Sequence, residues 1–254
     1  MKITTVALFL LFSPLLYGQI TYAKLLNNPN FNWIIDSTLQ EVNLYYLADG
    51  WTFKNIEKVS SKISHHYRST TSFIGLESYT PKIHLFIVNS RDQMKLLIGR
   101  ETNGAAFYQY NTVTGIATEH LKSIYSNHEL FHALAMNAWG VPKRWINEGM
   151  AVYADNNWHG HDLHQLAHYL VEKGQFVPLK KLINNFKKVD DRTAYPLMGS
   201  FVKFLDETYG RDMVLKIWKR KRNNLSPLIG KPLDQIEKEW VEMLKSTNYK
   251  GIIY

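Results

Sequence analysis

The chain has 254 residues, of which 45% are hydrophobic and 13% aromatic, so it can bury a sizeable core and is not an intrinsically disordered protein. It carries a formal charge of +8 and no cysteine, which excludes disulfides, a lipid-anchored cysteine and a cysteine-based zinc site. The densest basic run, residues 219–222, follows a helical-looking stretch and is expected to be a solvated helix end, so we expect no nucleic-acid partner.

The N-terminus has the three parts of a secretory signal peptide. Lys2 precedes an apolar run at residues 6–16, and Gly18 offers a small residue at a cleavage point, with Ala23 as an alternative. The run is short for a membrane span, which disfavours a permanent anchor. We therefore expect residues 1–18 to be removed on export to the periplasm or the exterior. The mature chain, 19–254, is then expected to form a single domain that is not inserted in the membrane.

Strands mixed with helices are predicted for the first half of the chain. Residues 41–47 read as a strand and residues 53–67 as a helix. Residues 82–88 are almost continuously apolar, which predicts a strand covered on both faces. Residues 104–110 and 112–117 are expected to pair as a hairpin that turns between them.

After Thr118 the pattern is helical throughout. Glycines and prolines punctuate this half of the chain, and they predict where its helices stop and start. The predicted stops are Gly174, Gly210 and Gly230, and the predicted first-turn prolines are Pro178, Pro196 and Pro232. This order, with the sheet first and the helices after it, predicts an α+β fold.

The segment S-N-H-E-L-F-H-A-L at residues 126–134 places two histidines and a glutamate in a stretch that becomes almost wholly apolar. Residues 121–139 read as a largely buried helix. His128 and His132 are four residues apart, so their imidazoles share one face and can converge on one metal ion. Glu129 lies beside the pair and can hydrogen-bond a water on that ion. This is the H-E-x-x-H pattern of zinc peptidases, although two hydrogen-bonded core histidines would show the same spacing.

A third ligand is available a short distance downstream, and a carboxylate is a common third ligand of catalytic zinc. After a helix stop at Gly140 only a few residues precede a second helix, so the two helices are expected to be neighbours. Glu148 lies in the first turns of that second helix and can face the histidines; a solvated helix glutamate is the alternative. Asp155 is two turns further along the same face, where it could orient a ligand histidine or be an ordinary surface aspartate.

The sequence H-E-L-F-H followed by W-I-N-E-G-M-A resembles the gluzincin metallopeptidases, and within them the compact peptidase MA-like group. Three later stretches, at residues 176–182, 195–202 and 229–240, are similar to that group in order and spacing. Two branches of the gluzincins fit less well. Val152 stands where thermolysin-like members have an acid, and residues 104–110 lack the G-x-M-E-N motif of the aminopeptidase branch.

The resemblance implies a zincin-like fold, in which a small twisted N-terminal sheet packs over the active-site helix and a helical C-terminal half follows. The metal lies in the cleft between the two halves. It also implies one Zn²⁺ per chain, with His128, His132 and Glu148 as its ligands and Glu129 as the catalytic base. In zincins an extended substrate usually pairs with a sheet edge beside the metal, and residues 104–110 or 112–117 are the candidates for that edge.

Zincins commonly stabilise the developing oxyanion with a tyrosine or histidine from the helical half. Tyr195 fits this role best, because Pro196 is expected to fix it at a helix start and small residues follow. Histidines at positions 159, 161 and 168 are the alternatives. The histidine cluster at 159–168 also permits a second metal site, if 161, 164 and 168 share a helix face, although adventitious metal binding would explain it equally well.

The predicted function is an exported zinc metallopeptidase that hydrolyses peptide or protein substrates with a zinc-activated water and a glutamate base. A catalytically inactive zincin-like binding module at the cell surface is the main alternative. A basic surface-binding protein without metal is a third. Metal analysis separates the third from the other two, and hydrolysis of a denatured protein separates the first from the second.

Overall fold

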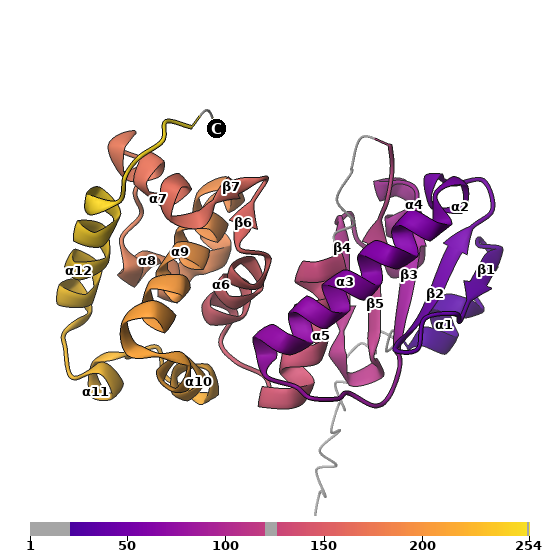
Figure 1. The fold of residues 1–254 in the computed structure, drawn as a ribbon, viewed down its shortest axis with the longest axis horizontal. Helices are drawn as coiled ribbons and strands as arrows, with labels where there is room; N and C mark the ends of the chain where they lie inside the picture. The colour runs from indigo at the N-terminus through magenta and orange to yellow at the C-terminus, as the bar shows by residue number, and fades with distance from the viewer. Residues whose placement is uncertain (1–20, 120–125, 253) are drawn as a thin grey trace, which may run out of the picture.

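The computed structural model describes residues 21–119, 126–252 and 254. The predicted signal peptide, 1–18, and the predicted helix start at Leu121 lie outside these residues. The described chain has an N-terminal part built on a five-stranded sheet and a C-terminal part built mainly of helices (Figure 1). The predicted order of sheet first and helical half second is therefore confirmed.

Within the described ranges, no helix has the length and apolar character needed to cross a membrane.

The sheet is mixed and has the strand order β1-β2-β3-β5-β4. Its three central strands are parallel, whereas the two edge strands, β1 and β4, pair antiparallel with their neighbours. The predicted hairpin of β4 and β5 is confirmed, and it turns at Asn111, which has a φ of 48°. The strands are β1 Trp33–Asp36, β2 Val42–Leu47, β3 Ile83–Val88, β4 Gly104–Phe107 and β5 Thr112–Ile116.

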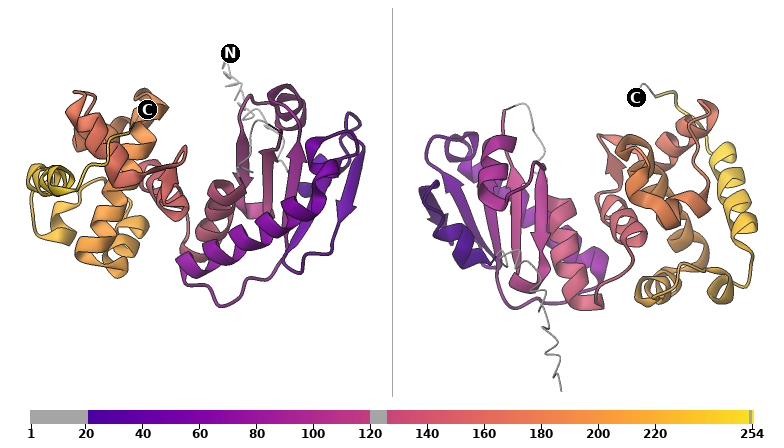
Figure 2. Two further views of the ribbon diagram at one scale, coloured as in Figure 1. Left: turned by 45° about the horizontal axis from the view of Figure 1, so that its top comes forward. Right: turned by 180° about the vertical axis from the view of Figure 1, so that it is seen from behind.

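Helices cover both faces of the sheet, as the apolar run at β3 predicts. Leu85 and Ile87 belong to a hydrophobic cluster with α3 and α5, whereas Phe86 and Val88 belong to a second cluster with α1 and α4. Figures 1 and 2 show α3 and α5 lying side by side along one face. The helices of this part are α1 Tyr22–Leu26, α2 Trp51–Lys54, α3 Ile56–Ile74, α4 Arg91–Ile98 and α5 Ser126–Trp139, with a 3₁₀ turn η1 at Tyr108–Tyr110.

The C-terminal part is helical apart from one small hairpin, β6–β7, which the sequence pattern did not predict. Pro178 and Pro232 directly precede α8 and α12, close to their expected places. The prediction for Pro196 is wrong, because α9 begins at Asp191 and Pro196 lies inside it. The elements are α6 Arg144–Asp155, β6 Asn157–Trp158, β7 His161–Asp162, α7 Leu163–Glu172, α8 Leu179–Asn185, η2 Phe186–Lys188, α9 Asp191–Tyr209, α10 Arg211–Lys219, α11 Ser226–Ile229 and α12 Leu233–Ser246.

Two glycines allow α6 and α9 to cross closely. A Cβ added at Gly149 would lie 2.7 Å from Val202, and one added at Gly199 would lie 2.5 Å from Val152. Both contacts are shorter than real Cβ contacts, so neither position has room for a larger residue without a shift. The crossing fixes α6 to the helical part, although α6 follows α5 in the chain.

The two parts pack on each other through α5 and α10. Trp218 of α10 contacts Phe131 and Trp139 of α5, with ring centroids 6.0 Å and 5.3 Å apart. Arg211, at the start of α10, donates a 2.8 Å hydrogen bond to the backbone carbonyl of Phe73, the penultimate residue of α3. One hydrophobic cluster therefore continues from the sheet into the helical part.

Candidate metal centre

Two consecutive helices supply the three residues of the centre. α5 carries His128 and His132 one turn apart, and it ends before Gly140, which has a φ of 83° suited to a chain reversal. α6 begins at Arg144, four residues later, and carries Glu148 in its second turn. The short link places the helices side by side, as the sequence predicts.

The ligand atoms of these three residues converge. The Nε2 atoms of His128 and His132 are 3.0 Å apart. The Oε2 atom of Glu148 lies 3.3 Å from Nε2 of His128 and 3.4 Å from Nε2 of His132. The side chains are buried or nearly so. In the part of the chain that the structure describes, this is the one group of three His, Asp or Glu residues that could hold a metal ion.

A neighbouring amide orients one of the histidines. Asn147 lies next to Glu148 on α6, and its Oδ1 is 3.0 Å from Nδ1 of His132. An amide oxygen accepts hydrogen bonds but does not donate them, so His132 carries its proton on Nδ1. Its Nε2 lone pair therefore faces the other two ligand atoms. Asn147 belongs to the W-I-N-E-G-M-A segment that carries the resemblance, but no role was expected for it, because its contact with His132 depends on how α5 and α6 pair.

The electrostatics of the centre favour a positive charge between the three side chains. Burial opposes the charge of Glu148, but the interactions of its carboxylate with the His128 and His132 imidazoles outweigh burial and hold the pKa of this carboxyl far below its usual range. Burial also opposes protonation of His128, yet the carboxylates of Glu148 and Glu129 raise the pKa of its imidazole above the usual value. A cation is the charge that this arrangement best accommodates.

Glu129 lies between the centre and the edge of the sheet. Burial raises the pKa of its carboxyl above the usual value, and the neighbouring histidines only partly oppose this. The side chain passes Gly104 of β4 so closely that a Cβ added there would lie 2.8 Å from Cγ and 3.1 Å from Oε1 of Glu129. Of the two candidate edges, β4 is at the edge of the sheet and β5 is interior. Among the described residues no strand pairs with the outer side of β4, so Glu129 is next to an open edge of the described sheet.

Tyr195 of α9 reaches the same centre from the helical part. Its ring centroid lies 6.2 Å from that of His128, and the ring is also packed against Trp158 and Phe186. Burial and the carboxylate of Glu148 raise the pKa of its phenol strongly, so it is protonated at neutral pH. The Arg144 guanidinium interacts with both Tyr195 and Glu148, the latter at 3.6 Å.

Asp155 lies at the end of α6 and contacts the residue before the first histidine. Its Oδ1 accepts a hydrogen bond from the side chain of Asn127, which in turn accepts one of 2.6 Å from Thr70 of α3. Burial raises the pKa of Asp155. Asp155 thus holds Asn127 at the start of the described α5. Its charge raises the pKa of His128, but no hydrogen bond between Asp155 and this imidazole is present among the described contacts.

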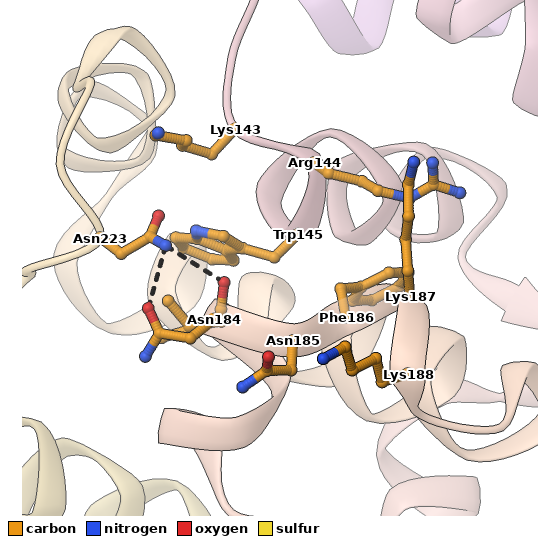
Figure 3. Close-up of a pocket in the computed structure, with 10 residues that line it drawn as sticks. Lys143, Arg144, Trp145, Asn184, Asn185, Phe186, Lys187, Lys188 and Asn223 are labelled. Atoms are coloured by element: carbon orange, nitrogen blue, oxygen red, sulfur yellow. Dashed lines mark hydrogen bonds between the residues drawn. The ribbon is translucent and has the colours of Figure 1, made fainter.

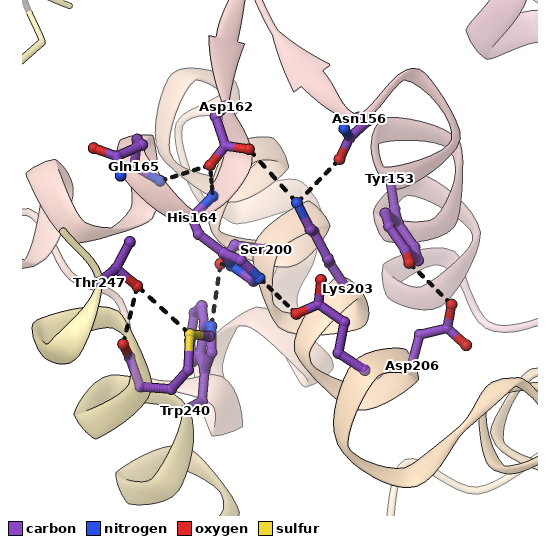
Figure 4. Close-up of polar contacts among 12 residues, drawn as sticks. Tyr153, Asn156, Asp162, His164, Gln165, Ser200, Lys203, Asp206, Trp240 and Thr247 are labelled. Carbon is purple, nitrogen blue, oxygen red and sulfur yellow. Dashed lines mark hydrogen bonds and ion pairs between the residues drawn. The ribbon is translucent and has the colours of Figure 1, made fainter. Parts of the chain in front are cut away.

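The histidine cluster at 159–168 does not form a second centre among the described residues. The segment is not one helix, because His161 lies in β7 and only His164 and His168 lie in α7. His164 contacts Ser200 at 2.8 Å and Glu207 at 3.1 Å within the polar network of Figure 4. His168 contacts the backbone carbonyl of Leu244. The histidines of α7 are thus engaged in packing the helical part.

Comparison with known proteins found no protein-family profile and no curated sequence that match this chain. Its function is therefore inferred from the geometry of the centre.

Proposed function

We propose that the protein is a zinc metallopeptidase of the gluzincin type, with a zincin-like fold. The observation that carries the proposal is the convergence of His128, His132 and Glu148 beside Glu129, which is itself next to an open strand edge. Two imidazoles and one carboxylate form a ligand set typical of catalytic zinc, which leaves a fourth position for water or substrate.

The separations of the ligand atoms are compatible with zinc. Two ligands about 2.0–2.1 Å from a tetrahedral ion lie roughly 3.3–3.4 Å apart. The observed separations of 3.0, 3.3 and 3.4 Å are close to that value without any rearrangement. Magnesium and calcium prefer oxygen ligands, so a centre with two imidazoles fits them poorly.

Zinc, when bound, would polarise a peptide carbonyl and acidify the attacking water. The residues of the chain supply the remaining functions. The raised pKa of Glu129 suits a base that takes a proton and then delivers it to the leaving amine. Tyr195 is neutral and can donate a hydrogen bond to the carbonyl oxygen as negative charge develops there. The free edge of β4 can pair with an extended peptide and hold it across the centre.

The test combines metal content with hydrolysis of a denatured protein. The purified protein should contain close to one zinc per chain and cleave the substrate. Glu129→Gln should retain the zinc and lose about 10²–10⁴-fold in activity, because the shape is kept and the base is lost. Zinc without hydrolysis in the wild type would instead support a catalytically inactive binding module. Full activity in Glu129→Gln would refute the assigned role.

We also propose that the protein acts after export. The proposal depends on the signal-peptide pattern, and N-terminal sequencing of exported protein should give a start near residue 19. An intact Met1 on a soluble cytosolic form would contradict it.

A further inference from the structure

A basic pocket of about 310 Å³ opens at the start of α6, next to the metal centre. It is lined by three segments that are distant in the sequence: the start of α6, the end of α8 with η2, and the loop before α11. Figure 3 shows the Trp145 indole among the lining side chains, with Asn184 and Asn223 near one of its ends. The cationic residues of the lining are Lys143, Arg144, Lys187 and Lys188.

Two polar groups of this lining lack partners among the described residues. Trp145 is 3% exposed, yet its indole N–H has no hydrogen-bond acceptor. The side-chain amide of Asn223 donates to the carbonyl of Ile183 at 3.3 Å and to Asn184 at 3.1 Å, but its own oxygen has no donor. Buried donors and acceptors are normally paired, so an unpaired donor and an unpaired acceptor in side chains of one lining favour a ligand. Both atoms have almost no accessible surface, so the two side chains must shift slightly for a ligand to reach them.

The backbone at the same place also favours an anion. α6 is a helix of 12 residues, and its N-cap, Lys143, provides no side-chain cap. The amide N–H groups of the first turn and the positive end of the helix dipole therefore lie at the pocket. Among the described ion pairs, Arg144 has Glu148 as a partner, whereas the three lysines have none.

The pocket adjoins the proposed catalytic residues. Arg144 lines the pocket and lies 3.6 Å from the ligand Glu148. Phe186 also lines the pocket, and its ring packs against that of Tyr195 with centroids 5.2 Å apart. The pocket and the metal centre are thus connected through Arg144 and through the contact of Phe186 with Tyr195.

We propose that this pocket is a substrate subsite that binds an acidic segment of a peptide, a proposal that rests on the peptidase function above. A peptide group offers both a carbonyl for the Trp145 N–H and an N–H for the Asn223 oxygen. An inorganic phosphate also offers both an O–H donor and acceptor oxygens at neutral pH, but it cannot extend from the pocket to the metal centre as a peptide can. Aspartate or glutamate side chains on the peptide then pair with the lysines at the rim. The preferred substrates are therefore peptides with carboxylates near the cleaved bond.

Binding is measured on the Glu129→Gln variant, so that no cleavage occurs. The probes are a fluorescein-labelled decapeptide with four glutamates and the same peptide with four glutamines. We expect the glutamate peptide to bind more tightly, and increasing salt to reduce the difference. Lys187→Gln together with Lys188→Gln should weaken its binding about 2- to 30-fold, the effect of two exposed ion pairs. The matched control is Lys180→Gln, an exposed lysine of α8 outside the pocket, which should have little effect.

Trp145→Phe tests the indole N–H itself and should weaken both peptides, with thermal unfolding followed to confirm that the variant is folded. Equal binding of the glutamate and glutamine peptides would refute the subsite. Equal weakening by Lys180→Gln would also refute it, by showing attraction to the overall charge. Displacement by millimolar phosphate or by short DNA, without a preference between the peptides, would assign the pocket to another anion. If the glutamate peptide binds as expected but the wild type cleaves neither peptide, the peptidase proposal is refuted, whereas the assignment of the pocket as a site for acidic peptides is retained.

Discussion

Gly104→Ala adds one methyl group beside Glu129 and so tests the position of the proposed base. The new Cβ would lie 2.8 Å from Cγ of Glu129, whereas carbon atoms in contact prefer about 3.5–4.0 Å. Glu129 is the more mobile partner, because its carboxylate is at the end of a flexible side chain. It must therefore retreat by roughly 0.7 Å or more.

A displacement of this size is sufficient to impair catalysis without unfolding the protein. A misplacement of about 1 Å can lower a rate about 10²-fold, so we expect kcat/KM to fall about 10- to 100-fold with zinc retained. Replacing glycine by alanine also reduces the entropy of the unfolded chain, which offsets part of the contact strain by about 0.4–1 kcal/mol. Overpacking typically costs about 1–3 kcal/mol, and the Thr114 backbone oxygen, 3.1 Å from the new Cβ, cannot move away as a side chain can. The free energy of unfolding should consequently fall by roughly 0–2.6 kcal/mol.

The assay is hydrolysis of a fluorogenic peptide, with zinc content and urea unfolding measured on the same samples. Gly115→Ala is a matched control, because Gly115 pairs with Gly104 across the β4–β5 ladder and an added Cβ there meets nothing within 4 Å. It should keep full activity. The reasoning is refuted if Gly104→Ala, folded and loaded with zinc, is as active as the wild type, or if both variants lose activity equally.

Three further predictions concern the surroundings of the centre. Tyr195→Phe should lower kcat about 10²–10³-fold in steady-state kinetics, with zinc and KM little changed, because it removes one hydrogen bond made mainly in the transition state; near-normal kcat would move that role to a histidine. Asn147→Ala removes the acceptor of the His132 proton and should weaken zinc binding about 10- to 100-fold in a chelator titration, and unchanged affinity would contradict the orienting role. Burial, with a smaller effect of Lys62, lowers the pKa of His66 from 6.5 to about 4. As the pH falls, His66 is therefore protonated in the unfolded chain before it is protonated in the folded protein. The stability that is present above pH 6.5 is consequently lost as the pH falls to about 4. His66→Leu should recover about 1–2 kcal/mol of that loss, after allowance for partial exposure, in urea unfolding at pH 7 and 4.5, and an unchanged pH dependence would exclude His66 as its source.

The sequence predicts those elements whose signal is local. The apolar run at β3 and the turn between β4 and β5 depend on neighbouring residues, and both are confirmed. β1 was missed because it is a short edge strand, and its apolar run of three residues, 33–35, is too short to indicate a strand by itself. α4 was missed although a signal is present: Ser90 caps it by accepting from the Gln93 N–H, and Gln93 bonds back to Asn89, which is close to a capping box.

The same distinction applies to the metal centre. The spacing of His128 and His132 fixes their common face within one helix, and a four-residue link is enough to predict that Glu148 lies near them. The contact of Gly104 with Glu129 joins residues that are 25 positions apart and depends on how the sheet packs on α5. The prediction that a helix starts at Pro196 was wrong for a related reason: Asp190 caps α9, which therefore begins five residues before the proline.

The close crossing of α6 and α9 gives the proposed zinc a mechanical role. Glu148 belongs to the helical part, because Gly149 and Gly199 let its helix cross α9 closely, whereas the histidines lie on α5, which packs on the sheet. An ion held by all three would link the two parts of the protein, which the backbone connects only through residues 140–143. A change that separates the two parts would lower the affinity for the metal. Metal binding would in turn oppose that separation by the same free energy. Removal of the metal by a chelator should therefore weaken the packing between the two parts, well beyond the three residues that lose their ligand.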